Sequence, residues 1–354
     1  MAQVKHFFAG ANSGAGFQNL FPQLLDLEDT YDFMILKGGP GVGKATFMRE
    51  IGQSMEQAGT TVEYLWCSGD PDSLDGVVLP ELRCAVVDGT PPHVVEPKYP
   101  AAVDRIVDLG RFYDLTAAKA SAEEAKQHTK TYKGAYVRAY HALNAARQVE
   151  LDLVAEGQKT FDWERAEKRT EGILKREFSK GGAEQGKTDY RFLGSITHKG
   201  YVWRFDSVQA LCPKVYELVD SWELSGAMLR RFHQAAAEKG WDSIACMAPE
   251  EPQRMEHLLI PGLGLAFVST HPGMEYPEKP FRRIRLDAMA EPENRGQNRL
   301  QSRIVTLLRE EGIHALKDAK ENHDRLEKVY NPYVDFDSVR ELAALEAGRL
   351  LSYL

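Results

Sequence analysis

The stretch Phe33-Met34-Ile35-Leu36-Lys37-Gly38-Gly39-Pro40-Gly41-Val42-Gly43-Lys44-Ala45-Thr46 decides the fold class. Its apolar beginning predicts a buried strand, and the spacing of Phe47, Ile51 and Met55 predicts a helix over 45–58. The glycine-rich segment between them fits the G-x-x-x-x-G-K part of a Walker A loop. A strand, a glycine loop and a helix in this order predict an α/β fold with a nucleotide site.

The residue types in this loop suit a triphosphate. Glycines let backbone N–H groups approach phosphate oxygens without a Cβ clash, and the N-terminus of the next helix adds unpaired N–H donors. Lys44 would place its charge on the β- and γ-phosphates. We therefore expect these nucleotide-binding residues: Gly39, Pro40, Gly41, Val42, Gly43, Lys44, Ala45 and Thr46.

One position departs from the Walker A pattern. The residue after the lysine is usually Ser or Thr, whose hydroxyl binds Mg²⁺, and here it is Ala45. Thr46 follows one position later, where it would support an α-phosphate or, with a water, replace the missing hydroxyl. The sequence therefore supports ATP binding more strongly than magnesium-dependent hydrolysis.

An apolar strand that ends in an acid, Cys84-Ala85-Val86-Val87-Asp88, is the Walker B candidate. Its carboxylate would lie beside the glycine loop and hold Mg²⁺, directly or through water. Lys44 and Asp88 are therefore the predicted catalytic residues, and Thr46 and Asp88 the predicted metal ligands. The next residue is Gly89, not the glutamate base of many ATPases, and a turn-capping role for Asp88 is the alternative.

Further polar residues are candidates for the same site. The loop 68–75 is rich in carboxylates, one of which would orient a water or a phosphate acceptor, and His93 would contact the γ-phosphate. Turn formation by the acids and a solvent-exposed surface for the arginines are the alternatives. The acids are Asp70, Asp72 and Asp75, and the candidate arginine fingers are Arg230, Arg231, Arg282, Arg283 and Arg285.

The second half of the chain repeats the first. Phe8 corresponds to Phe192 at a spacing of 184 positions, and glycine and proline pairs later in the chain keep a spacing of 181. The spacing shortens across the glycine loop. There the second copy reads Asp-Ser-Trp-Glu-Leu-Ser-Gly-Ala over 220–227, with one glycine and no lysine, and its acids would repel a triphosphate. Ser269 stands where the first copy has Asp88.

Strands alternate with a helix in each half, which predicts a parallel sheet with ligands at the carboxyl ends of its strands. Charged helical segments follow, over 101–179 in the first half and near 297–330 and 337–351 in the second. We therefore predict an α/β fold of tandem P-loop NTPase-like domains with mainly parallel sheets, each followed by a helical arm. The predicted divisions are a nucleotide-binding domain at 1–180, a linker at 181–189 and a degenerate domain at 190–354.

Composition excludes several other classes. The net charge is −8 and no Lys/Arg block dominates, which argues against nucleic acid as the main partner. No run of about 18 apolar residues and no apolar segment at the N-terminus occur, so we expect no membrane span. The four cysteines lack C-x-x-C spacing, and we expect free thiols in a cytoplasmic protein.

The chain resembles a family of bacterial tandem P-loop proteins of uncharacterised role, described as ATPases or ATP-binding proteins and familiar from Gram-positive spore-formers. The resemblance covers essentially the whole chain. It implies the tandem P-loop fold and ATP as the ligand. Members carry a P-loop in each half and a Ser-Thr pair after the lysine, and this chain departs from both. The matching segments are 6–10, 36–44, 70–75, and 87–93 followed by 97–100.

The primary interpretation is therefore an ATP-binding P-loop protein, with an ATPase site in the first half and a pseudo-domain in the second. A small-molecule or nucleotide kinase is the first alternative, with the loop 68–75 binding the acceptor and the helical arm as a lid. A non-catalytic nucleotide-sensing scaffold is the second, supported by Ala45. The absence of an N-K-x-D motif favours adenine over guanine.

Overall fold

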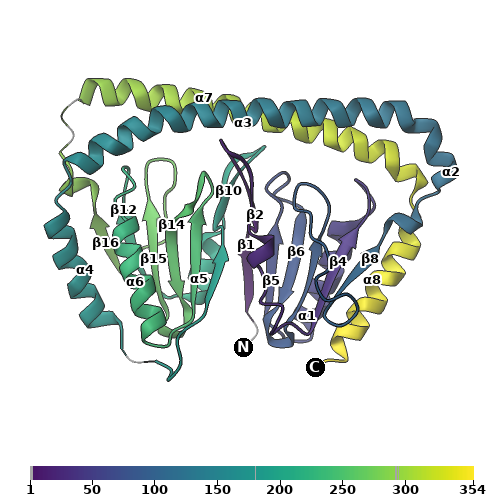
Figure 1. Ribbon diagram of the computed structural model, residues 1–354, viewed down its shortest axis with the longest axis horizontal. Coiled ribbons are helices and arrows are strands. Elements are labelled where there is room, and N and C mark those ends of the chain that lie inside the picture. The colour runs from purple at the N-terminus through teal and green to yellow at the C-terminus, as the bar shows by residue number, and fades with distance from the viewer. Residues whose placement is uncertain (1–2, 180, 292, 294) are drawn as a thin grey trace.

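The computed structural model describes residues 3–179, 181–291, 293 and 295–354. Two six-stranded sheets lie next to each other, and two long helices run across both of them (Figure 1). The first sheet has the order β1 (Val4–Phe7), β5 (Val62–Trp66), β6 (Leu74–Leu79), β7 (Cys84–Asp88), β4 (Asp32–Lys37) and β8 (Asp104–Asp108). The second has the order β16 (Arg282–Arg285), β12 (Lys214–Val219), β15 (Leu265–Thr270), β14 (Glu251–Ile260), β13 (Ser243–Ala248) and β9 (Thr188–Arg191).

Both sheets are mainly parallel, as expected, but each also contains one strand that runs antiparallel to its two neighbours. In the first sheet β1–β5, β4–β7 and β4–β8 pair parallel, whereas β6 pairs antiparallel with β5 and β7. The chain turns back directly after β5, where the Cys67 N–H donates to the Ser73 carbonyl at 3.0 Å. The loop predicted over 68–75 is therefore shorter, because β6 begins at Leu74.

The two sheets have the same strand order, as a duplication requires. Read outward from the centre, β1-β5-β6-β7-β4-β8 matches β9-β13-β14-β15-β12-β16, with the same parallel and antiparallel pairs. Phe8 and Phe192, which the repeat pairs in sequence, exchange two backbone hydrogen bonds of 2.9 Å. A residue that contacts its own counterpart lies on a pseudo-two-fold axis. The buried ion pair between Glu63 and Arg191 also joins the halves.

Two short hairpins lie beside this axis, β2–β3 (Gly10–Ser13 and Gly16–Asn19) and β10–β11 (Gly194–Thr197 and Gly200–Trp203). The Asn12 side chain donates to the carbonyls of Ser68 and Ile196, at 3.2 and 2.9 Å. Asn12 therefore links the loop after β5 to the second hairpin. The irregular segment between the halves ends where β9 begins at Thr188, within the predicted linker 181–189.

The helical arms cross from one half to the other. Helix α3 (Ala122–Lys159) leaves the first half and ends over the second, where α4 (Trp163–Glu177) packs on α6 (Gly226–Glu238) (Figure 1). Helix α7 (Arg295–Tyr330) runs beside α3 in the opposite direction. It delivers α8 (Phe336–Leu351) to α1 (Lys44–Gln57) of the first half. Each sheet is therefore followed by an arm, but the last helix of each arm covers the other half.

The exchanged helices are part of the hydrophobic cores that they reach. Their apolar residues recur at helical spacing on one face, which is the pattern of a helix packed on a core. Asp162 and Asp335 cap the two helix starts, accepting hydrogen bonds from the N–H groups of Arg165 and Ser338. The buried residues are Ala166 and Ile173 on α4, and Val339, Ala343, Ala347 and Leu350 on α8.

Shorter helices complete the fold, α2 (Leu115–Ala118) before α3 and α5 (Phe205–Leu211) before β12. All four cysteines are free thiols. None of the helices in the described part of the chain is long and apolar enough to cross a membrane.

Candidate nucleotide site

The glycine loop joins the end of β4 to the start of α1. The backbone of Gly41 and Gly43 has positive φ angles of 74° and 95°, a region that side chains with a Cβ rarely adopt. Gly43 is also the residue that precedes α1, so the turn into the helix depends on it. The backbone conformation therefore favours glycine at positions 41 and 43 of the loop.

The backbone N–H groups of this loop are free. Gly41, Val42 and Gly43 donate no backbone hydrogen bond to any residue that the structure describes. The bonds of α1 begin with Phe47, whose N–H donates to the Gly43 carbonyl at 2.9 Å, so the N–H groups of the first helical turn are also unpaired. Together they form a group of donors without backbone acceptors at a helix N-terminus, where phosphates commonly bind in proteins.

Lys44 and Asp88 lie together, as their predicted roles require. The Lys44 ammonium is 3.6 Å from Asp88 Oδ2, and both side chains are only 12% exposed. Lys44 also donates to the carbonyls of Gly38 and Gly39, at 2.9 and 3.0 Å. Its charge is therefore held over the loop itself, at the position from which it would reach phosphate oxygens.

Asp88 uses its two carboxylate oxygens differently. Oδ1 accepts hydrogen bonds from the Thr90 N–H at 2.8 Å and from the Thr90 hydroxyl at 2.6 Å. Oδ2 faces Lys44. The turn-capping role and the position beside the loop therefore occur in the same residue. Of the two predicted metal ligands, Asp88 is buried at the loop, whereas Thr46 is exposed.

His93 is buried and ties the predicted site to the neighbouring loop. One ring nitrogen, Nδ1, lies 2.9 Å from the Asp88 carbonyl, and the other, Nε2, lies 3.5 Å from Asp75 Oδ1. Burial alone would lower the pKa of His93, but the carboxylates of Asp75 and Asp88 raise it to about 9. The ring packs on Phe21, with 4.9 Å between centroids. His93 is therefore a buried cation between two loops.

This ion pair predicts a pH-dependent stability. The pKa of His93 is about 9 in the folded state and near the ordinary histidine value of 6.5 in the unfolded state. Its contribution is therefore complete below pH 6.5 and is lost as the pH rises through 9. We expect about 3 kcal/mol of unfolding free energy to depend on it. Urea unfolding at pH 6 and pH 9.5 measures the loss of unfolding free energy between these two pH values. In His93→Gln this pH-dependent loss should be smaller by about 3 kcal/mol. An equal loss in both proteins would contradict the assignment.

The three acids of the loop 68–75 each have a cationic partner. Asp70 lies 3.3 Å from the Lys320 ammonium, which belongs to α7, and Asp72 pairs with Lys199 of the second half. Asp75 pairs with His93. These contacts favour a structural role for the acids, because a general base needs a carboxylate that is available to its substrate.

The candidate arginine fingers are not brought to the glycine loop. Arg231 pairs with Glu167 and Glu171 of α4, and Arg283 pairs with Glu217 of the second sheet. Strand β16, which carries Arg282, Arg283 and Arg285, is the outer edge of that sheet, at the end opposite the first half. The arginine-finger prediction is therefore wrong for this arrangement of the halves.

The end of α7 covers the glycine loop, which no sequence motif indicated. A Cβ on Gly41 would lie 2.5 Å from the Asn331 side-chain amide and 3.2 Å from Glu327 Cβ. In the amide orientation that satisfies both of its polar atoms, Asn331 donates to the Gly41 carbonyl at 3.2 Å. From the other side, the Tyr113 hydroxyl donates to the Pro40 carbonyl at 2.9 Å. The second half therefore supplies part of the wall around the loop.

The same turn of α7 carries His323, Asp324 and Glu327. One ligand atom from each lies within 4.8 Å of the others, a group able to hold a cation. Burial lowers the pKa of His323, against the opposing effect of Glu327 and Asp324. The i, i+1, i+4 spacing of these residues was visible in the sequence, but their position near the loop depends on the crossing of the arms.

The corresponding loop of the second half is occupied by its own carboxylate. Asp220 Oδ1 accepts from the N–H groups of Trp222 and Leu224, at 3.2 and 2.8 Å, and Oδ2 accepts from the Ser225 N–H at 2.7 Å. Ser225 precedes α6 as Gly43 precedes α1. The donors that are free in the first half are therefore paired in the second, and Asp220 fills the place of an anion.

The arms also close over this second loop. Arg147 of α3 donates to Glu223 Oε1 at 2.6 Å, and it pairs with Glu251 after β13. In the first half, Lys320 of α7 pairs with Asp70 after β5 in the same way. The two arms are therefore anchored by equivalent ion pairs, but among the described residues the first half alone has these N–H donors without a partner.

No protein-family model matches the chain, and the comparisons with curated proteins and with solved structures gave no match either. The resemblance to tandem P-loop proteins therefore stays a prediction from the sequence.

Proposed function

We propose that the chain is an ATP-binding P-loop protein of the cytoplasm, with one nucleotide site in the first half and an ATPase activity that depends on it. The observation that carries the proposal is the free group of N–H donors in the glycine loop, together with the Lys44 ammonium beside them. The second half then acts as a pseudo-domain, because Asp220 already occupies its loop.

ATP binding would change the hydrogen-bond partners of Lys44. Its ammonium now donates to two carbonyls of its own loop, and it would turn to the β- and γ-phosphate oxygens. The N–H groups of residues 41–46 would donate to the remaining oxygens. Asn331 and Glu327 lie against Gly41, so the end of α7 would have to adjust to the phosphates.

The residues at the loop fit Mg²⁺ through a single carboxylate. Mg²⁺ commonly keeps several waters and takes one or two carboxylates together with substrate phosphates. Asp88 Oδ2 faces the loop and would hold the ion directly or through water, while Ala45 offers no oxygen. The ion would neutralise charge on the phosphates. Asp88 would position it, and Lys44 would balance the negative charge.

The test is ATP binding and phosphate release by the purified protein, with and without Mg²⁺. We expect ATP to bind, and phosphate release to require Mg²⁺. In Asp88→Asn, which keeps an oxygen for Thr90, binding without Mg²⁺ should be unchanged and release should fall at least about 10-fold. Isothermal titration and a coupled phosphate assay give the two readouts.

Each outcome selects one interpretation. Binding with slow, magnesium-dependent release supports the ATPase. Binding without release would select the nucleotide-sensing scaffold, and release that requires an added acceptor would select the kinase. Absence of ATP binding would overturn the proposal.

A further inference from the structure

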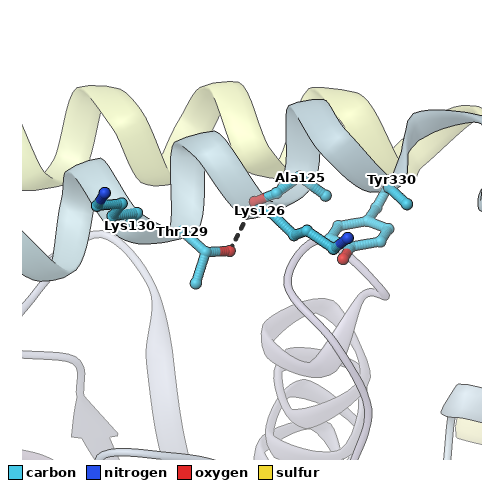
Figure 2. Close-up of a pocket in the computed structure, with 6 residues that line it drawn as sticks. Ala125, Lys126, Thr129, Lys130 and Tyr330 are labelled. Carbon is cyan, nitrogen blue, oxygen red and sulfur yellow. Dashed lines mark hydrogen bonds between the residues drawn. The ribbon is translucent and has the colours of Figure 1, made fainter.

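An open surface pocket of about 390 Å³, called the cavity below, lies between the beginning of α3 and the end of α7 (Figure 2). Its volume is within the range of small-ligand sites and is sufficient for a nucleobase with part of a ribose. The figure shows Lys126 on α3 and Tyr330 at the end of α7, which both line the cavity. The lining residues are Ala122, Ala125, Lys126, Thr129, Lys130 and Tyr330.

The cavity lies next to the glycine loop. Tyr330, which lines it, is followed directly by Asn331, whose amide contacts Gly41. The Tyr330 ring also packs edge-on against Tyr113, with 5.8 Å between centroids. The Tyr113 hydroxyl in turn donates to the Pro40 carbonyl at 2.9 Å. Two separate contacts therefore connect the wall of the cavity to the loop that would hold phosphates.

The lining combines an aromatic face with positive charge. Tyr330 is half-buried and Lys126 and Lys130 are exposed. Lys126 pairs with Glu123 at 2.6 Å, whereas Lys130 forms no ion pair with any residue that the structure describes. The Thr129 hydroxyl donates to the Ala125 carbonyl at 2.7 Å, so its oxygen is left as an acceptor. An aromatic ring suits stacking with a base, the Thr129 oxygen suits an amino group, and lysines suit an anionic ligand.

We infer that this cavity is the subsite for the purine base of the nucleotide whose phosphates lie on the loop 38–46. The base would stack on Tyr330, and the Thr129 oxygen would accept from its exocyclic amino group. The inference rests on the proposed function, because it takes the phosphate position from the loop. The inference goes beyond the proposed function because it assigns recognition of the base to α3 and α7, so that both arms contact the nucleotide.

The test compares ATP with inorganic tripolyphosphate, which carries the phosphates without the base. We expect Tyr330→Ala to weaken ATP binding roughly 10-fold or more, because it removes the stacking surface, and to leave tripolyphosphate binding unchanged. Tyr330→Phe keeps the ring and should bind ATP like the unchanged protein. Ala122→Trp, which places a large side chain in the cavity, should also weaken the binding of ATP and leave the binding of tripolyphosphate unchanged.

The outcomes separate this inference from the proposed function. The subsite is overturned if Tyr330→Ala and Ala122→Trp leave ATP binding unchanged, or if they weaken ATP and tripolyphosphate equally. In the first case the phosphate site would stand without this subsite. Failure of the unchanged protein to bind either ligand would overturn both proposals. Equal thermal midpoints of the variants, measured without ligand, confirm that folding is not the cause.

Discussion

Lys44→Ala is expected to weaken ATP binding by about 100-fold or more and to abolish phosphate release. The Lys44 ammonium lies between the loop carbonyls and Asp88, with only 12% of the side chain exposed. Its removal leaves the Asp88 carboxylate without that cation, close to where the negative charge of the phosphates would be. Loss of one partner from such a buried charge pair costs roughly 2–5 kcal/mol, which corresponds to this factor in affinity.

A matched control separates this effect from a general loss of charge. Lys168 on α4 is 75% exposed and pairs with Glu164 on the surface, so Lys168→Ala removes the same charge at a distance from the loop. Isothermal titration with ATP should show no change for this variant. If Lys44→Ala bound ATP within about threefold of the unchanged protein, the phosphate site would not be at this loop.

Leu350→Ala on α8 is expected to lower the unfolding free energy by about 2–5 kcal/mol, the usual cost of truncating a fully buried leucine. Leu350 is fully buried in the core that contains Met48 and Ile51 of α1. The control is Leu345→Ala on the same helix. Leu345 is 69% exposed, and its truncation should change the free energy by no more than about 0.5 kcal/mol. Urea unfolding measures both.

Hydrogen exchange locates the effect of the first substitution. Because α8 packs on α1, Leu350→Ala should speed amide exchange in α1 and β4 of the first half more than in α6 and β12 of the second. The opposite pattern would show that α8 stabilises its own half of the chain, and would contradict the exchange of helices between the halves.

Local features of the fold could be predicted from the sequence. The apolar run before Gly38 forms β4, the predicted helix over 45–58 corresponds to α1, and Cys84–Asp88 is a strand. Each depends on neighbours within a few positions, such as a hydrophobic period or a glycine before a helix. The short distance between Lys44 and Asp88 could also be predicted, because β4 and β7 are parallel neighbours whose carboxyl ends lie at the same edge of the sheet.

Features that depend on distant parts of the chain could not be predicted in this way. The charged helices were recognised, but an amphipathic pattern does not identify the sheet on which a helix packs, so the crossing of α4 and α8 was missed. The contacts of Glu327 and Asn331 with Gly41 follow from that crossing. Asp220 and Glu223 were expected to repel a triphosphate, whereas the Asp220 carboxylate accepts hydrogen bonds from the N–H groups of Leu224 and Ser225.

The most direct test of the account is the number of ATP molecules bound by each chain. Isothermal titration should give one per chain, because the N–H groups of Gly41 to Gly43 bond to no residue in the described ranges, whereas Asp220 accepts from the corresponding N–H groups of the second half. It should give none for Lys44→Ala over the same concentration range. Two ATP molecules per chain, or one that persists in Lys44→Ala, would contradict the assignment of a single site to the first half.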